Sequence, residues 1–477
     1  MKKRVYIFLL INTILPCSFI ALGYTQGDEH TYCYPDCNVI LISIDALRAD
    51  HLGCYGYHRN TSPHIDTFAE KSIIFENAFS HIADTWPSHM TMLCSLYPSI
   101  YNLAIPDDPS IKPQVLSDSI ITLPQILKKN GYTTGAFVVL PGFIGFDRGF
   151  DWYHEGEFLH WWWINEIKYV ENKNFFEDND MFKWIEANKN NKFFLFFHTY
   201  AVHDPYISPN DKLFTNPDYK GSISSNIEEM RKAEHSINYF DRFDKKDERD
   251  IQHLVDLYDG CIVYIDKQLA AFFKKLDEFD LLDKSIVIIT ADHGEAFGEH
   301  GDFGHGHGSF YNECLHIPLI IKLPDNIKKR IKDDVALIDL TPTILALVGI
   351  KFKPPGYFYQ GIPLIYSLKG KLLSRDIYTE SINGDDFTLK TKQWKFISLN
   401  RSEDFIKDCQ LFDITVDPGE NDNVIGKFPS IAWVLYQRAM DIYQRNIQLK
   451  EKFKSKKSKK DFDKETIGLY KTLGYFE

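Results

Sequence analysis

Residues able to bind a divalent cation follow three apolar stretches of this sequence. The run Asn38–Ile44 ends at Asp45, the run 192–197 ends at His198, and the run 285–290 leads to Asp292-His293. Carboxylate oxygens and an imidazole are common ligands of such ions, and a bound ion polarises an ester oxygen and activates a hydroxyl group. Because parallel strands place their carboxyl ends at one edge of a sheet, we expect these stretches to build one composite site.

These stretches belong to an alternation of strands and helices. Continuous apolar runs of this kind are typical of buried strands in a parallel sheet. Helical spacing is found at 120–130, which ends at Gly131, and at 250–278, while 333–349 is typical of a short strand followed by a helix. Short β-type pieces at 387–389, 394–399 and 410–414 come later. The sequence therefore predicts an α/β sandwich with a small C-terminal antiparallel sheet.

The composition indicates a globular protein, and the N-terminal segment indicates export. The chain has 477 residues, with 54 Lys and Arg against 66 Asp and Glu and a net charge of −12. This acidic balance does not favour polyanion binding, so we expect no nucleic-acid partner. Residues 1–23 combine a basic start with one long apolar run, which predicts a signal peptide or an N-terminal membrane anchor. The rest of the chain is then extracytoplasmic, whether periplasmic, secreted or anchored to a membrane facing outward.

Several blocks of the sequence resemble the sulfatase branch of the alkaline phosphatase superfamily. They occur in family order as ILISIDALRADHLGCYGYHRNTSPHIDTFA, DTWPSH, TADHGEAFGEHG, GHGSFYNECLHIPLIIK, LIDLTPTILALVGI and LFDITVDPGENDN. Separate blocks in order are far more specific than a lone motif. The resemblance implies an alkaline-phosphatase-like three-layer sandwich with a mostly parallel central sheet. We assign residues 38–365 to this catalytic domain, 366–430 to a small C-terminal antiparallel-sheet subdomain, and 431–477 to a helical and basic tail.

The resemblance also implies a nucleophile and a metal site. In this branch the nucleophile opens a helix beneath the metal, and Thr85 of Asp-Thr-Trp-Pro-Ser-His occupies that position. A hydroxyl placed beside a cation at a helix N-terminus ionises more readily, which makes attack on phosphorus or sulfur feasible. One divalent ion (calcium, manganese, magnesium or zinc) is implied, and a second ion is left open. The expected ligands are Asp45, Thr85, Asp292 and His293.

Further histidines match positions that contact the ester in this branch. His203 stands where the family often carries Asp-Pro-His-x-Pro-Tyr, although Ala201-Val202 replace the first pair. The match implies that His203 binds the anionic group or protonates the leaving group. The branch places a cationic residue in the Gly-His-Gly-His-Gly segment, and His307 fits that catalytic position better than His305. His305 and His89 are expected to bind substrate.

Two departures from the branch bear on the substrate. Typical sulfatases oxidise a Cys or Ser nucleophile to formylglycine, but the methyl group on Cβ of Thr85 prevents formation of that aldehyde. The Arg that normally steadies formylglycine is His89 here. A Thr nucleophile resembles phosphodiesterase and lipoteichoic-acid-synthase-like relatives, which form a phospho-threonine intermediate. We therefore expect a hydrolase of sulfate or phosphate esters, with phosphoesters favoured.

The sequence leaves the identity of the ester open. The substrate is expected to be a small-molecule, glycan or lipid-linked ester. One alternative is a phosphoethanolamine or phosphoglycerol transferase held at a membrane by its N-terminal segment. Another is a catalytically inactive homologue that binds an anion, since fold resemblance alone does not establish chemistry.

Overall fold

The computed structural model describes most of the chain beyond the N-terminal segment. The described residues are 32–103, 114–140, 142–155, 180–223, 245–306, 308–351, 359–372, 374–382, 384–399, 408–453 and 456–457. Both the predicted signal or anchor at 1–23 and His307 lie outside these ranges. Within them, no helix combines the length and the apolar character that crossing a membrane requires.

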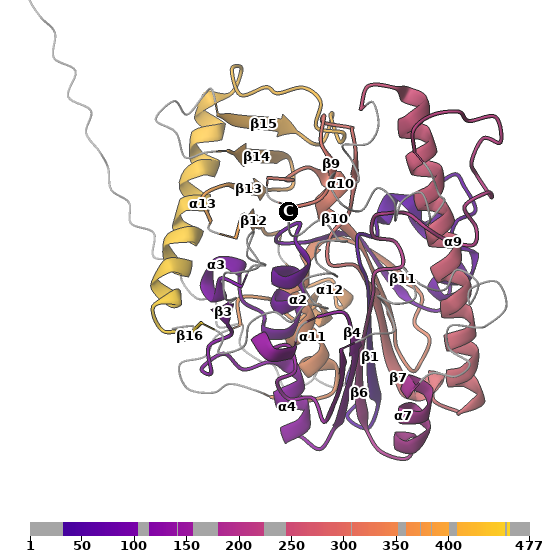
Figure 1. Cartoon of the computed structure of the whole chain (residues 1–477). Coiled ribbons are helices and arrows are strands. Elements are labelled where there is room, and N and C mark those ends of the chain that lie inside the picture. The colour runs from indigo at the N-terminus through magenta and orange to yellow at the C-terminus, as the bar shows by residue number, and fades with distance from the viewer. Residues whose placement is uncertain are drawn as a thin grey trace, which may run out of the picture.

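An eight-stranded sheet forms the centre of the molecule (Figure 1). From edge to edge its strands are β11 (Lys329–Ala336), β2 (Ile73–Phe79), β10 (His316–Lys322), β7 (Ser285–Thr290), β1 (Asn38–Ile44), β6 (Phe193–Thr199), β4 (Thr133–Val138) and β5 (Trp152–Glu155). β10 runs antiparallel to both of its neighbours, and the other neighbouring pairs are parallel. The prediction of a mostly parallel central sheet is confirmed.

The three predicted apolar stretches are the three central strands β7, β1 and β6. Every residue of each strand is buried, which explains why their sequences are apolar throughout rather than alternating. β1 pairs in parallel with both partners, with Ile44 opposite Thr199 and Ser43 opposite Thr290. This register brings the residues that follow the three strands to one edge of the sheet.

Helices cover both faces of the sheet and complete the three layers. Figure 1 shows α2, α4 and α11 on one side and α9 on the other. α9 is long and begins after Asp247, whose side chain accepts a hydrogen bond from the Arg249 backbone N–H. The helices of these layers are α1 (Pro63–Ala69), α2 (Thr85–Cys94), α4 (Leu123–Lys129), α7 (Asp180–Asn188), α9 (Glu248–Glu278) and α11 (Leu340–Leu347). The predicted α/β sandwich is thus confirmed.

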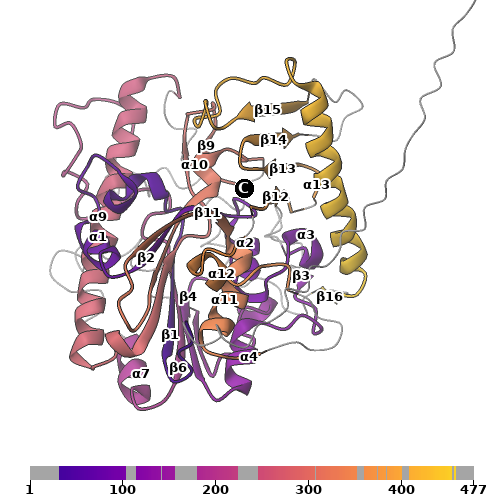
Figure 2. The ribbon, with the colours of Figure 1, turned by 180° about the vertical axis from the view of Figure 1, so that it is seen from behind.

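The strands of a second, antiparallel sheet follow those of the large sheet in the sequence, and the last long helix covers this second sheet, as seen from behind in Figure 2. It consists of β12 (Ile377–Glu380), β13 (Phe387–Lys390), β14 (Trp394–Ser398) and β15 (Cys409–Asp413), with α13 (Pro429–Lys450) packed on it. The predicted small antiparallel sheet is confirmed. The remaining short elements are β3 (Gln114–Val115), β8 (Ala296–Phe297), β9 (Phe303–Gly304), β16 (Lys456–Lys457), α3 (Pro98–Tyr101), α10 (Asn312–Leu315) and α12 (Ile365–Leu368).

A buried ion pair within the small subdomain, between β14 and the loop that precedes α13, also contacts the large domain. Lys395 of β14 lies 2.7 Å from Glu420, and the exposed fractions of the two side chains are 2% and 1%. Lys395 Nζ also donates to Asn312 Oδ1 at the start of α10. His300 Nε2 lies 3.1 Å from the Glu420 backbone oxygen. The small sheet therefore supports the segment between β8 and α10.

Candidate active site

Two carboxylates and an imidazole meet at the edge where β1 and β7 end. Asp45 directly follows β1, whereas Asp292 and His293 follow β7, and all three side chains are fully buried. One carboxylate oxygen from each aspartate and one ring nitrogen of His293 all lie within 4.8 Å of one another. The structure thus brings together three of the four residues predicted to bind the ion.

Hydrogen bonds show which nitrogen of His293 faces this cluster. Its Nδ1 lies 2.9 Å from the Gly294 backbone oxygen, and a carbonyl can only accept, so Nδ1 carries the proton. Nε2 then presents its lone pair to the carboxylates, at 3.4 Å from Asp292 Oδ2 and 3.9 Å from Asp45 Oδ1. These two oxygens accept no hydrogen bond from the described residues. Acceptors facing one another across a buried space fit a bound cation.

The electrostatics of the two carboxyl groups lead to the same conclusion. Burial raises the pKa of Asp45, and burial together with the charge of Asp45 raises the pKa of Asp292 well above its usual value. Burial lowers the pKa of His293 to about 4, so its imidazole is neutral at pH 7. A divalent cation would offset the repulsion between the carboxylates and would bind the neutral imidazole, and these residues therefore fit such an ion.

Gly294 allows the segment after His293 to pass close to α10. A Cβ atom at this position would lie 2.1 Å from the Glu313 backbone oxygen. The Gly294 N–H donates to the Cys314 backbone oxygen at 2.8 Å. The absence of a side chain at Gly294 therefore lets the backbone that carries His293 be anchored on the neighbouring segment.

The hydroxyl of Thr85 lies beside the same cluster. Thr85 is the first residue of α2 and is fully buried. Its Oγ1 is 3.3 Å from Asp45 Oδ2, to which it donates, and 3.4 Å from His293 Nε2. The N-terminal end of a helix also favours negative charge. The predicted nucleophile and the predicted metal ligands therefore lie in one group.

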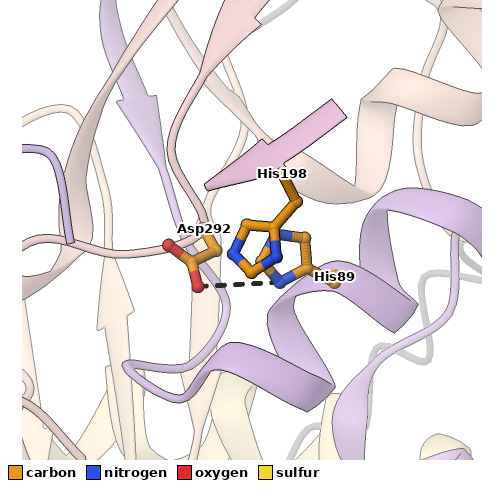
Figure 3. A group of neighbouring side chains, drawn as sticks. All are labelled: His89, His198 and Asp292. Atoms are coloured by element: carbon orange, nitrogen blue, oxygen red, sulfur yellow. Dashed lines mark ion pairs between the residues drawn. The ribbon is translucent and has the colours of Figure 1, made fainter. Parts of the chain in front are cut away.

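His89 of α2 and His198 of β6 lie next to Asp292, with His89 Nδ1 3.6 Å from Asp292 Oδ2 (Figure 3). His89 Nδ1 donates to the Thr85 backbone oxygen at 2.7 Å, so its Nε2 accepts from Ser43 Oγ at 2.9 Å. Burial and then His198 lower the pKa of His89 well below its usual value. His89, which we expect to bind substrate, has both of its nitrogens bonded to protein atoms in this structure.

His198 contacts Asp45 directly. Its Nε2 lies 3.0 Å from Asp45 Oδ2, and its ring centroid is 4.2 Å from that of His89. Burial, His203 and His293 lower the pKa of His198 to about 3, so the ring is neutral and Nε2–H donates to the carboxylate. Sequence reasoning placed His198 at a strand end of the composite site but did not name it among the expected metal ligands. Its position at the same sheet edge as Asp45 was the available signal.

A second group of polar residues lies next to His293. The ring of His305, in the loop after β9, has its centroid 4.2 Å from that of His293 and 4.7 Å from that of His203. His203 Nδ1 is 3.1 Å from Asp204 Oδ1, and His305 Nδ1 is 3.0 Å from Glu295 Oε1. The predicted site residues His203 and His305 are thus brought together beside the first cluster.

Charges within this second group set its protonation. Burial disfavours the charged form of His203, but Asp204, then Asp45 and Glu295, raise its pKa to about 10. Burial and then His203 lower the pKa of His305 to about 4. Burial and the charge of Asp204 raise the pKa of Glu295 to about 8. Without a bound ion, the positive charge of this group therefore resides on His203.

Comparison with known proteins assigns the chain to a family. The family model described as Sulfatase matches residues 37–350, which is well over half of the chain. The chain belongs to the sulfatase family. A second model, described as the C-terminal part of N-sulphoglucosamine sulphohydrolase, matches residues 298–442 of this sulfatase-family chain. The resemblance inferred from the sequence blocks is confirmed.

Individual relatives of this sulfatase-family protein are distant. Human arylsulfatase K is 28% identical over 225 residues, an alignment that covers 44% of this chain and 41% of the relative. The alignment thus spans about two-fifths of that curated relative. Human iduronate 2-sulfatase is 25% identical, with 72% of this chain and 74% of the relative covered. By their names, both relatives are ester hydrolases.

The fold is also shared with solved structures. The crystal structure of the phosphonate monoester hydrolase of Agrobacterium radiobacter matches with a TM-score of 0.64 and 18% sequence identity. The match covers 86% of this chain and 96% of the hydrolase. At this identity the likeness establishes the fold, and the chemistry has to be argued from the residues of the site.

Proposed function

We propose that this sulfatase-family protein is an exported, metal-dependent ester hydrolase that uses Thr85 as its nucleophile and favours phosphate esters. The observation that carries the proposal is the position of Thr85 Oγ1, 3.3 Å from Asp45 Oδ2 and 3.4 Å from His293 Nε2 at the start of a helix. The basic and apolar segment at 1–23 supports export, either as a signal peptide or as an anchor.

The group of Asp45, Thr85, Asp292 and His293 would hold one divalent ion. Oxygen ligands with a single imidazole suit calcium, magnesium, manganese or zinc, so these donors do not select one of the four. When bound, the ion would favour ionisation of the Thr85 hydroxyl and polarise the ester. His198 donates a hydrogen bond to Asp45, and His89 donates one to the Thr85 backbone oxygen, so both histidines help to fix the position of the group.

In the proposed reaction, Thr85 Oγ attacks the phosphorus in line with the leaving oxygen. The Oγ–P bond forms while the bond from phosphorus to the ester oxygen breaks, giving phospho-Thr85 and an alcohol. The hydroxyl proton moves along the hydrogen bond to Asp45 Oδ2 and returns to Thr85 Oγ in the second step, while the leaving alcohol takes its proton from solvent water. Water then attacks the same phosphorus, the P–Oγ bond breaks, and Thr85 regains a proton as phosphate leaves.

The positive charge of the second group faces the charge of the ester. The ring of His305 lies beside the rings of both His293 and His203. We assign His203 and His305 to the non-bridging oxygens of the ester, whose negative charge is otherwise costly to bury. This assignment retains His203 as a residue that binds the anionic group.

Phosphate rather than sulfate follows from the chemistry of the nucleophile. Thr85 cannot be converted to formylglycine because its Cβ carries a methyl group. His89, at the position of the Arg that steadies formylglycine, bonds to Thr85 O and Ser43 Oγ. A phospho-threonine needs neither feature, and the phosphonate monoester hydrolase named above shows that this fold also serves phosphorus chemistry.

Turnover of three substrates by the full chain tests the proposal. Metal-stripped protein is supplied in turn with calcium, magnesium, manganese or zinc and given an aryl phosphate monoester, an aryl phosphodiester and an aryl sulfate. We expect the phosphorus esters to be cleaved and Thr85→Val to abolish cleavage. Acid-quenched reactions should carry phosphate on the peptide that contains Thr85.

A matched control lies on the same helix. Thr91 is also fully buried in α2, and its Oγ1 lies 2.7 Å from Tyr101 Oη, with no contact to the metal ligands. Thr91→Val should therefore lower stability but keep turnover. Phosphoester cleavage that persists in Thr85→Val would refute the nucleophile, and faster cleavage of the sulfate would refute the substrate preference. Phosphoryl transfer to an added alcohol without hydrolysis would favour the transferase.

A further inference from the structure

The turn that follows β1 has an unfavourable backbone conformation. Ala46 comes directly after Asp45 and is in the left-handed region, with a φ of 56°. Residues other than glycine rarely adopt this conformation, because Cβ then lies too close to a carbonyl oxygen. They keep it only where the surrounding structure holds it in place. The turn that carries Asp45 therefore depends on contacts that fix the Ala46 backbone.

The backbone N–H of Ala46 contacts the second carboxylate of the cluster. It donates to Asp292 Oδ1 at 3.2 Å, and the same oxygen accepts from the His293 N–H at 2.9 Å. With Oδ1 held by two donors, Oδ2 of Asp292 is the oxygen that faces His293 Nε2, at 3.4 Å. The turn after β1 therefore orients a carboxylate that follows β7.

A tyrosine hydroxyl from α9 joins the two ends of this turn. Tyr258 is fully buried, and its hydroxyl donates to the Ala46 backbone oxygen at 2.8 Å. The same hydroxyl oxygen accepts from the Arg48 backbone N–H at 2.9 Å. Burial raises the pKa of Tyr258 well above its usual value, so the hydroxyl keeps the proton that it donates. Both hydrogen-bonding functions of one side chain are thus used on the turn.

The ring of Tyr258 is itself held by aromatic neighbours. Its centroid lies 4.9 Å from that of Phe297, 5.1 Å from that of His51 and 5.4 Å from that of Tyr206. Edge contacts of this kind restrict how far a ring can move. Figure 1 shows α9 and α2 on opposite sides of the central sheet. The site is therefore supported from both layers, with Thr85 supplied by α2 and Tyr258 by α9.

We propose that Tyr258 is a positioning residue for the divalent ion, because its hydroxyl holds Ala46 in the left-handed conformation and so fixes Asp45 and Asp292. Asp45 shares a peptide bond with Ala46, and Asp292 accepts the Ala46 N–H, so a shift of the turn moves both carboxylates. The hydroxyl acts through the backbone of Ala46 and Arg48 rather than on the ion. This role rests on the ion site of the proposed function.

Binding of manganese to the full chain tests the role without using activity. Metal-stripped protein is titrated with Mn²⁺, and the free ion is followed by its electron paramagnetic resonance signal. Tyr258→Phe keeps the ring and removes the hydroxyl. We expect its affinity for Mn²⁺ to be about 10- to 100-fold lower than that of the wild type, the range typical of residues that orient metal ligands.

Tyr55→Phe is the matched control. The Tyr55 hydroxyl also accepts from a backbone N–H, that of Leu319 at 2.8 Å, and lies 3.1 Å from the Phe75 backbone oxygen. These bonds join β10 and β2 rather than the turn after β1. Loss of this hydroxyl should therefore lower stability but leave the affinity for Mn²⁺ unchanged.

A second variant separates positioning of the turn from a general loss of stability. Glycine adopts the left-handed conformation readily, so Ala46→Gly allows the turn to form without the hydroxyl. We expect Ala46→Gly combined with Tyr258→Phe to regain most of the lost affinity. Hydrogen exchange of the Ala46 amide in metal-free protein should become faster in Tyr258→Phe, because its bond to Asp292 opens more often.

The outcomes distinguish this inference from the proposed function. Wild-type affinity or unchanged amide exchange in Tyr258→Phe would overturn only the positioning role. The same holds for a loss of affinity that Ala46→Gly does not restore, or one that Tyr55→Phe reproduces. Failure of the wild type to bind manganese, calcium, magnesium or zinc would refute the ion site itself, and with it the proposed function.

Discussion

Replacing His198 with phenylalanine should weaken binding of the divalent ion at the proposed active site. The change keeps a ring against His89 and Tyr200 but removes the Nε2–H that donates to Asp45 Oδ2 at 3.0 Å. Asp45 Oδ2 then accepts a hydrogen bond only from Thr85, at 3.3 Å, among the described residues. The carboxylate becomes freer to rotate, and its orientation toward the ion is no longer fixed.

The size of the effect follows from this one hydrogen bond. A hydrogen bond to a charged group contributes about 1.5–3 kcal/mol. Removing a residue that orients a metal ligand typically lowers affinity about 10- to 100-fold, which corresponds to roughly 1.4–2.7 kcal/mol. The two ranges agree with each other. Both apply here because His198 is buried and its neutral ring donates to Asp45. We therefore expect the dissociation constant of the ion to rise about 10- to 100-fold.

Competition with a chromophoric chelator measures this change directly. Metal-stripped wild type and His198→Phe are titrated with the same ion, and unfolding is followed in parallel by circular dichroism. His316→Phe is the control, because His316 lies in β10 of the same sheet and its Nε2 donates to the Glu76 backbone oxygen at 2.8 Å. Unchanged affinity in His198→Phe, or an equal loss in His316→Phe, would refute the reasoning.

Two further predictions concern stability, and a third concerns metal binding. Burial raises the pKa of Asp266 from 3.8 to about 6, so the folded state binds this proton more tightly than the unfolded state. The stability gained from the protonated carboxyl group is complete below pH 4 and is lost as pH rises through 6. The control is Asp266→Asn, whose remaining oxygen can still accept the N–H groups of α1. Relative to this variant, the free energy of unfolding of the wild type in urea titrations should fall by up to about 3 kcal/mol between pH 4 and 7. Lys395→Met should cost about 3–5 kcal/mol in the same assay because Glu420 is left buried and unpaired, and an unchanged midpoint would contradict this. Gly294→Ala should displace His293 and lower zinc stoichiometry by one, and wild-type stoichiometry would show that the backbone adapts.

Much of the scaffold could be predicted because it depends on local sequence patterns. The uninterrupted apolar runs before Asp45, His198 and Asp292 are the central strands, as expected for segments buried on both faces. The helix predicted at 250–278 is observed at Glu248–Glu278. Such patterns report burial and periodicity, which neighbouring residues largely determine.

The partners of individual side chains could not be predicted in the same way. His89 was expected to bind substrate, yet its nitrogens bond to the Thr85 backbone and to Ser43, on an element that sequence patterns do not align with α2. The sequence placed Glu295 near the loop of His305 but did not show that the two side chains bond to each other. These hydrogen bonds, 2.7 to 3.0 Å long, join segments that only the packed fold brings together.

The sequence by itself determined the family, the α/β scaffold and the types of residue delivered to the strand ends, because motifs and apolar runs are local properties of the chain. Only the tertiary structure decided how those residues are used. It placed Thr85 against Asp45 and His293, and hydrogen bonds fixed which nitrogen of each histidine faces the site. It also brought Asp204 next to His203 and Glu295 next to His305. The reason is that hydrogen bonding and charge compensation act through space, across segments that are far apart in the sequence.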